Sequence, residues 1–468
     1  MRRIALSGLV ALAAVLGSVA VPAAAAAQST AGAAAAAAES ILVPSVAAPS
    51  IASAKPMAGV RPTTAARPGS AAAMRAAEAA LAADGDTASG SPFISCVLAT
   101  DCLGVEGGSS QRVGGAPARP RIARWNGSSW KGVRVTLPTG AKSVDLTGVS
   151  CRGAKSCLVV GDYYTSTSDS ATSHALALAY NGTSLRPTAT VPLPTGANGS
   201  MLTSVSCATT RHCVALGEEV GSPGTFSDVS RSVIIIETWN GARWTLRTAA
   251  GSIGKTTLLQ PNVVSCATSA FCVLGGLAIS VTSGSEKVYL ASWNGRKLTT
   301  MKAPTVGGGT DYPVVSGLSC ATAAHCAVAG AHDASAADTA GQTAFTEVWN
   351  GRTWRLATTA WPKGAALSFM FGVSCYGARS CQAVGLDAAS DAGTAPFDAA
   401  AVSLNGTAGT VQAVPAPSRG RSTIFTAVSC LPWGSCVAVG ATGQANAEAG
   451  AVMTGVWNGK AWKLEPGF

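Results

Sequence analysis

The stretch Val456-Trp457-Asn458-Gly459-Lys460-Ala461-Trp462 decides the fold. Asn-Gly between two apolar runs is a strong signal for a β-hairpin, because both residues tolerate positive φ. Seven hairpin stretches of this kind follow one another along the chain. Their Asn-Gly pairs begin at Asn126, Asn181, Asn240, Asn294, Asn350, Asn405 and Asn458. We therefore expect a chain built from seven copies of one unit.

A pair of cysteines precedes each hairpin at a fixed spacing. The first cysteines are Cys96, Cys151, Cys207, Cys266, Cys320, Cys375 and Cys430, and serine precedes every one of them. The second cysteines are Cys102, Cys157, Cys213, Cys272, Cys326, Cys381 and Cys436. The pairs recur at intervals of 54 to 59 residues, which is typical of solenoids and propellers.

Each unit contains four short segments with strand character. In the last unit, Val428-Ser429-Cys430 is the first and Cys436-Val437-Ala438-Val439-Gly440 is the second. A third strand ends at Trp457, and a fourth runs through Trp462. The sequence therefore predicts an all-β fold, a seven-bladed β-propeller with four antiparallel strands per blade. A right-handed β-helix is the alternative, but its coils are shorter and lack hairpins. Because neither end offers a spare strand, we expect the ring to close without strand exchange.

The cysteine pairs bracket the turn between the first two strands. We expect one disulfide per blade, although spacing alone does not prove the connectivity. Closing so short a loop stabilises the fold by roughly 2 kcal/mol. Zinc sites use closer cysteine pairs that converge, whereas these pairs belong to different blades, so we expect no metal site. No Cys-x-x-Cys is present, so we expect no redox role, and no cofactor is expected. His212 and His325, each preceding a second cysteine, are interpreted as turn or surface residues.

The N-terminal region differs in composition from the repeats. Residues 1–27 have a basic start, an apolar run and small residues suited to cleavage, which predicts a signal peptide. A retained membrane anchor is the alternative. Residues 28–90 are rich in alanine and proline and are predicted to be a disordered linker or propeptide. The propeller is expected over residues 91–468, secreted to an extracellular location, without stable membrane insertion after cleavage.

The chain of 468 residues has a formal charge of +10. Its lysines and arginines are scattered rather than clustered, so we expect no nucleic-acid partner. We expect a monomer.

Nine of the 11 tryptophans belong to the hairpins. Four hairpins hold two, as in Trp125 with Trp130, and a two-residue turn makes the two rings diagonal neighbours on one face. We interpret them as packing between blades, because leucine replaces them at Leu185, Leu298 and Leu404. Sugar-stacking platforms are the alternative interpretation.

The hairpin resembles the aromatic-Asp/Asn-Gly-x-x-Trp repeat of bacterial and fungal propeller lectins. That resemblance covers the hairpins of the seven units and not the paired cysteines. It implies a propeller, and it implies that such units bind fucose or related sugars.

Acidic and aromatic residues gather just after the second strand of several units, on the face opposite the cysteine turns. The candidate ligand-binding residues are Asp162, Tyr163, Tyr164, Glu218, Glu219, His332, Asp333, Asp387 and Asp391. Variable loops on a rigid scaffold are where binding residues usually lie. The alternative is that these are solvated loop charges.

The sequence thus predicts a secreted, non-enzymatic binding or scaffold propeller whose partner is a cell-surface glycan, a wall polymer or a protein. The alternative is an extracellular glycosidase or lyase that acts on a polysaccharide through these carboxylates. No catalytic residues are assigned, because the sequence contains no nucleophile elbow, zinc-protease motif or phosphate-binding loop.

Overall fold

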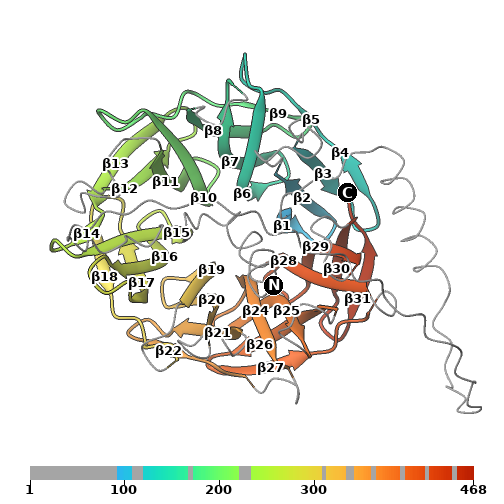
Figure 1. Ribbon diagram of the computed structural model, residues 1–468. Coiled ribbons are helices and arrows are strands. Elements are labelled where there is room, and N and C mark those ends of the chain that lie inside the picture. Colours follow the sequence, from blue (N-terminus) through green and yellow to red (C-terminus); the bar gives the residue numbers. More distant parts are fainter. Residues whose placement is uncertain are drawn as a thin grey trace, which may run out of the picture.

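The computed structural model describes residues 92–107, 120–166, 172–220, 233–307, 313–333, 342–359, 365–389, 396–416, 421–444 and 451–468. Across these ranges the regular structure consists of 31 strands in seven sheets, without helices. The sheets stand as blades around a ring (Figure 1), which confirms the seven-bladed propeller. The predicted signal peptide and linker, residues 1–27 and 28–90, lie outside the described residues. Within the described part of the chain, no helix is long and apolar enough to span a bilayer.

Each blade is an antiparallel meander of four consecutive strands. Blade one comprises β1 (Pro92–Leu98), β2 (Asp101–Glu106), β3 (Arg121–Trp125) and β4 (Trp130–Gly132). Blade two comprises β6 (Ser143–Gly153), β7 (Ser156–Tyr164), β8 (Ser173–Tyr180) and β9 (Ser184–Pro187). Blade three comprises β10 (Gly199–Thr209), β11 (His212–Val220), β12 (Val233–Trp239) and β13 (Trp244–Ala250). Blade four comprises β15 (Thr257–Thr268), β16 (Phe271–Ser280), β17 (Glu286–Trp293) and β18 (Leu298–Met301).

The remaining blades repeat this order. Blade five comprises β19 (Pro313–Thr322), β20 (His325–Asp333), β21 (Gln342–Trp349) and β22 (Trp354–Leu356). Blade six comprises β24 (Leu367–Cys375), β25 (Ser380–Ala388), β26 (Asp398–Asn405) and β27 (Ala408–Gln412). Blade seven comprises β28 (Arg421–Cys430), β29 (Cys436–Gln444), β30 (Ala451–Trp457) and β31 (Trp462–Pro466). Short strands β5 (Arg134–Val135), β14 (Ser252–Ile253) and β23 (Thr358–Thr359) extend blades two, four and six.

One row of residues crosses every blade at the same end. In blade one, Cys96 lies opposite Cys102, Cys102 opposite Trp125, and Trp125 opposite Trp130. All seven cysteine pairs form disulfides within their blades, as predicted. We call this end of each blade, with its disulfide and its third-to-fourth-strand loop, the cysteine end. The opposite end, where the second strand runs into the third, is the loop end.

The hairpin geometry corrects one detail of the sequence prediction. Trp125 and Trp130 are direct cross-strand partners, so the loop between them has four residues and the rings are not diagonal neighbours. The side-chain oxygen of Asn126 accepts hydrogen bonds from the N–H groups of Ser128 and Ser129, which folds the loop. Gly127 adopts φ of 98°, a conformation that favours glycine. The Asn-Gly pair therefore fixes a longer loop than the expected two-residue turn.

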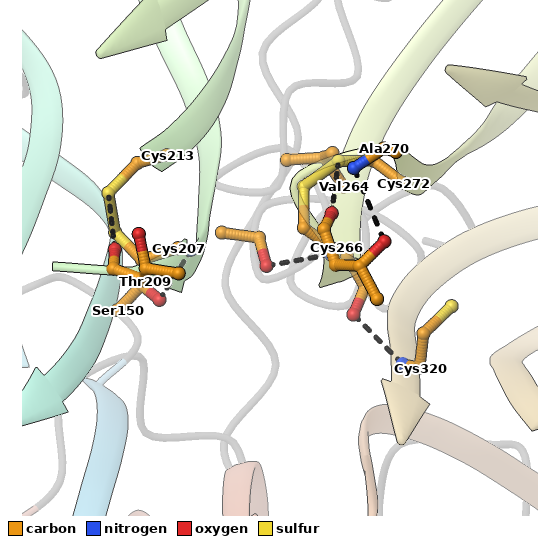
Figure 2. The surroundings of a disulfide bond; sticks show 12 residues. Ser150, Cys207, Thr209, Cys213, Val264, Cys266, Ala270, Cys272 and Cys320 are labelled. Carbon is orange, nitrogen blue, oxygen red and sulfur yellow. Dashed lines mark hydrogen bonds between the residues drawn. A yellow bond between two sulfur atoms is a disulfide. The ribbon is translucent and has the colours of Figure 1, made fainter. Parts of the chain in front are cut away.

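The serine before each first cysteine links neighbouring blades. Its hydroxyl oxygen accepts a hydrogen bond from the N–H of the first cysteine of the next blade, at 2.9 to 3.0 Å in all seven cases. Figure 2 shows Ser150 beside Cys207 and, further round the ring, Cys320, whose N–H donates to Ser265, the residue before Cys266. The seven serines are Ser95, Ser150, Ser206, Ser265, Ser319, Ser374 and Ser429. The seven Ser-Cys pairs thus form a closed ring of hydrogen bonds, a role that sequence reasoning did not assign to them.

Blade seven meets blade one without exchanging a strand, as expected. Ser429 accepts the N–H of Cys96 across this junction, and the Trp130 indole N–H donates to the hydroxyl of Thr454 at 2.8 Å. The ring of Phe468 packs on Trp130, with centroids 4.6 Å apart. Figure 1 shows β31 beside blade one. The closure therefore uses the same kinds of contact as the other blade junctions.

Candidate functional site

The hairpin tryptophans are largely buried, which favours packing over sugar stacking. Trp125 is 1% exposed, Trp244 5% and Trp462 4%. The Trp244 indole N–H donates to Thr188, which follows the fourth strand of blade two, and that of Trp462 donates to Gln412 of blade six. These rings fill the junctions between blades, so the cysteine end offers no row of open aromatic platforms. Trp433, in the cysteine turn of blade seven, is the exception at 64% exposed.

The loop end of blade two gathers a carboxylate pair. Asp162 on β7 lies directly opposite Asp145 on β6, so their side chains share one face of the sheet. The Ser173 hydroxyl donates to Asp162 at 2.7 Å and also contacts the backbone carbonyl of Ser200 in blade three. Asp145 packs against blade one, where a Cβ added to Gly107 would lie 2.5 Å from its carboxylate. The pair therefore lies where three blades meet.

Burial and mutual repulsion control the charge of this pair. Burial, and then the charge of Asp162, raise the pKa of Asp145 to about 8. Burial also raises the pKa of Asp162, while hydrogen bonds from Ser173 and Tyr164 counteract it. Burial and the charge of Asp162 both favour the protonated form of Asp145 near neutral pH. Sequence reasoning identified Asp162 and missed Asp145, because a partner 17 positions upstream becomes visible only with the strand register.

Two tyrosines accompany the carboxylates, and both are half-buried. Tyr164 hydrogen-bonds to Asp162, and burial raises the pKa of its phenol to about 12. Tyr163 points to the other face of the sheet and contacts the ring of His174, with centroids 5.1 Å apart. We call Asp145, Asp162, Tyr163, Tyr164, Ser173 and His174 the blade-two site.

The other candidate residues occupy the loop ends of other blades. Glu218 and Glu219 are near the end of β11, and burial raises the pKa of Glu218 to about 7. Asp387 on β25 faces Asp398, and burial followed by that charge raises its pKa. His332 borders a cavity of about 210 Å³ between blades five and six. Asp391 and the side chain of Asp333 lie outside the part of the chain that the structure describes.

These residues do not converge on one pocket. They belong to blades two, three, five and six, and β7 and β25 lie on opposite sides of the ring (Figure 1). A second cavity, of about 170 Å³, lies at the axis and is lined by the first strands of all seven blades. Neither this cavity nor the one beside His332 is lined by a carboxylate. Three of the candidate residues, Asp162, Tyr163 and Tyr164, belong to the blade-two site, which is more than the structure describes in any other blade.

Two further buried carboxylates escaped sequence reasoning. Glu237 and Glu347 are fully buried, two residues before Trp239 and Trp349 on the third strands of blades three and five. Burial raises the pKa of each to about 8. The corresponding residues of the other blades are uncharged. A charged residue at a repeated core position was therefore the sequence signal that could have identified Glu237 and Glu347.

Comparisons with known proteins do not assign this chain to a family. No protein-family model matches the chain, and no curated protein matches it. Three similar solved structures are an alpha-L-arabinanase from Penicillium chrysogenum complexed with arabinobiose, Sqt1 from Chaetomium thermophilum, and the major Malassezia sympodialis allergen Mala s 1. Their identities are 12, 12 and 13%, and their TM-scores are 0.34, 0.38 and 0.33. The matches cover 58, 72 and 60% of this chain and 78, 74 and 83% of the others.

Proposed function

We propose that this chain is a secreted, non-enzymatic binding propeller that recognises a glycan of a cell surface or wall polymer through its loop end. The observation that carries the proposal is the blade-two site, where half-buried Tyr164 stands beside the carboxylates and half-buried Tyr163 contacts His174 on the other face of the same sheet. Carbohydrate and other small-ligand sites combine apolar or aromatic surface with a few fixed polar groups. A protein partner at the same surface is the outcome that the test below distinguishes.

The rigidity of the ring supports this function. Seven disulfides brace the individual blades, and the serine hydrogen bonds hold neighbouring blades together. Disulfides persist in oxidising environments such as the extracellular space, which fits a secreted protein. A ligand at the loop end therefore meets side chains that are already in place, and little conformational entropy is lost on binding.

Binding of the full mature chain to an array of surface glycans and to insoluble wall polymer tests the proposal. We expect Tyr163→Ala to weaken binding at least about tenfold, because the variant removes an aromatic contact surface. Trp433→Ala is the matched control, since it removes an exposed aromatic side chain at the cysteine end of the propeller. Absence of binding to every glycan and polymer, or equal binding by the Tyr163 variant, contradicts the glycan proposal. Binding to a surface protein alone would replace it with a protein-recognition function.

The carboxylate pair supports a second candidate, the glycosidase or lyase. Direct cross-strand partners have Cβ atoms about 5 Å apart. Retaining glycosidases need a similar carboxyl separation, with one group protonated. Asp162, however, is only 3% exposed, so substrate access is restricted. Release of reducing ends or unsaturated products from wall polysaccharide by the parent chain, abolished in Asp145→Asn and Asp162→Asn, would establish the enzyme; its absence leaves a binding protein.

A further inference from the structure

One disulfide differs from the other six in its surroundings. The Nε2 atom of His325, from blade five, lies 3.2 Å from the Sγ atom of Cys381 in blade six. His325 is 3% exposed, so the interpretation of this histidine as a turn or surface residue was wrong. The side-chain ligand atoms of His325, Cys375 and Cys381 all lie within 4.8 Å of one another. Within the described residues, this is the one group of three such side chains that could hold a metal ion.

The orientation of the histidine suits metal ligation. Nε2 faces the sulfur, and the imidazole also hydrogen-bonds to the backbone of Trp349. A hydrogen bond from the second ring nitrogen to a backbone carbonyl is the usual way in which proteins fix the tautomer of a metal-binding histidine. When the nitrogen that bonds to Trp349 is Nδ1, the lone pair of Nε2 is directed at Cys381.

The comparison between blades shows that this arrangement is particular to one junction. His212 occupies the same position in blade three, but it forms no such group with the disulfide of blade four. In blade four the position holds Phe271, which packs against the apolar cluster around Cys320 and Cys326. An apolar cover therefore suffices structurally, and the histidine contributes a ligand atom that packing does not require.

We propose that the blade-six disulfide is a redox-gated metal site, in which reduction frees Cys375 and Cys381 to bind a divalent cation of the zinc class together with His325. A dithiol reductant supplies two electrons and two protons; the S–S bond breaks, two thiols form, and the reductant closes its own disulfide. The cation then displaces both thiol protons and is held by two thiolates and one imidazole nitrogen. Cysteine and histidine are the ligands that zinc prefers, and three protein ligands leave a fourth position open.

Within a single repeat, the cysteine spacing does not suit a metal site. Cysteines separated by five residues are unusual zinc ligands within a loop. Here the two sulfurs face each other across a hairpin, with Cα atoms 3.9 Å apart, and the third ligand comes from the neighbouring blade. The site exists only because the propeller packs His325 against Cys381.

The test uses the full mature chain, graded amounts of a phosphine reductant, and Co²⁺ as a spectroscopic probe. The phosphine carries no thiol to compete for the metal; it takes oxygen from water and leaves both protons on the cysteines. We expect Co²⁺ to bind one per chain with a thiolate charge-transfer band. Alkylation and mass mapping should place Cys375 and Cys381 as the first pair reduced when Co²⁺ or Zn²⁺ is present, because the metal stabilises the reduced form.

His325→Ala is expected to lower the affinity for Co²⁺ at least about tenfold, as loss of a ligand or of its orienting partner does in other metal sites. His325→Phe, which copies Phe271 of blade four, restores the apolar cover and should fold while binding equally weakly. His212→Ala is the matched control and should bind like the parent. Absence of the charge-transfer band, an unchanged affinity in both His325 variants, or prior reduction of another disulfide in the presence of metal would overturn the proposal.

Discussion

At the cysteine end of the ring, all seven blades carry the same serine and the same disulfide; at the loop end, the candidate positions change from blade to blade. The position of Asp162 shows this. The corresponding residues of the other blades are Gly107, Glu218, Leu277, Ala331, Leu386 and Ala441. The cysteine end repeats because each blade must make the same contacts with the next one. The loop end carries no such requirement, so its side chains are free to serve recognition.

The largest effect is expected where the repeated contacts are broken. Trp125 is 1% exposed and packs at the junction of blades one and seven. Trp125→Ala should destabilise the ring by about 3–5 kcal/mol, because it removes a large buried side chain and leaves a cavity. Denaturant unfolding of the oxidised chain measures this loss.

Trp433→Ala provides the control for that variant. Trp433 also lies at the cysteine end, but it is 64% exposed and belongs to no repeated row. Its replacement should change the free energy of unfolding by no more than about 0.5 kcal/mol. Equal losses in the two variants would mean that the buried row does not hold the blades together.

A smaller effect is expected from the serine ring. Ser429→Ala leaves the N–H of Cys96 without its acceptor at the closure, and Ser95→Ala does the same to Cys151 between blades one and two. Each should cost about 1 kcal/mol, the typical net value of one hydrogen bond. We expect similar losses, because the closure makes the same contact as an internal junction.

Unfolding of both serine variants in parallel decides the question. A loss at Ser429 several times that at Ser95 would show that the closure, which lacks strand exchange, depends on this bond more than other junctions do. No loss in either variant would mean that water replaces the hydroxyl.

The fold was predictable from the sequence because the cysteine pair and the Asn-Gly hairpin recur in seven consecutive units. The Asn-Gly pairs and the cysteine spacing predicted the number of blades, the strand order and every disulfide. The four-residue hairpin loop was missed because the side chain of Asn126 accepts two backbone N–H groups, which a reading by turn type does not consider.

The candidate site was predictable only in part. Asp162 was found because it follows a recognisable strand, whereas Asp145 needed the register that places it opposite. His325 lies 56 residues from Cys381 in the sequence, and only the packing of two blades brings them together. The repeats predict contacts within one blade. A contact that a single side chain makes with the next blade can be found only once the packing of the blades is known.

The smallest effect on the fold is expected at the loop end, and it depends on pH. The folded-state pKa of Asp145 is about 8, well above the ordinary value of 3.8 expected for an unfolded chain. Between these values the folded protein holds a proton that the unfolded chain has lost, so stability falls as pH rises through this window and levels off above it. Asp145→Asn removes this carboxyl, so thermal unfolding from pH 4 to pH 9 should show a shallower decline than the parent.

The decline that remains in Asp145→Asn is assigned to the other carboxyls whose pKa burial raises. These are Glu237 and Glu347, each with a pKa of about 8, Glu218 with a pKa of about 7, and Asp162 and Asp387. Tyr163→Ala is the control, because it alters the same end of blade two without removing a carboxyl and should keep the slope of the parent. If Asp145→Asn also keeps that slope, Asp145 is ionised in the folded chain. The loop end of blade two would then hold two neighbouring ionised carboxylates, and the contrast between a structural cysteine end and a functional loop end would become stronger.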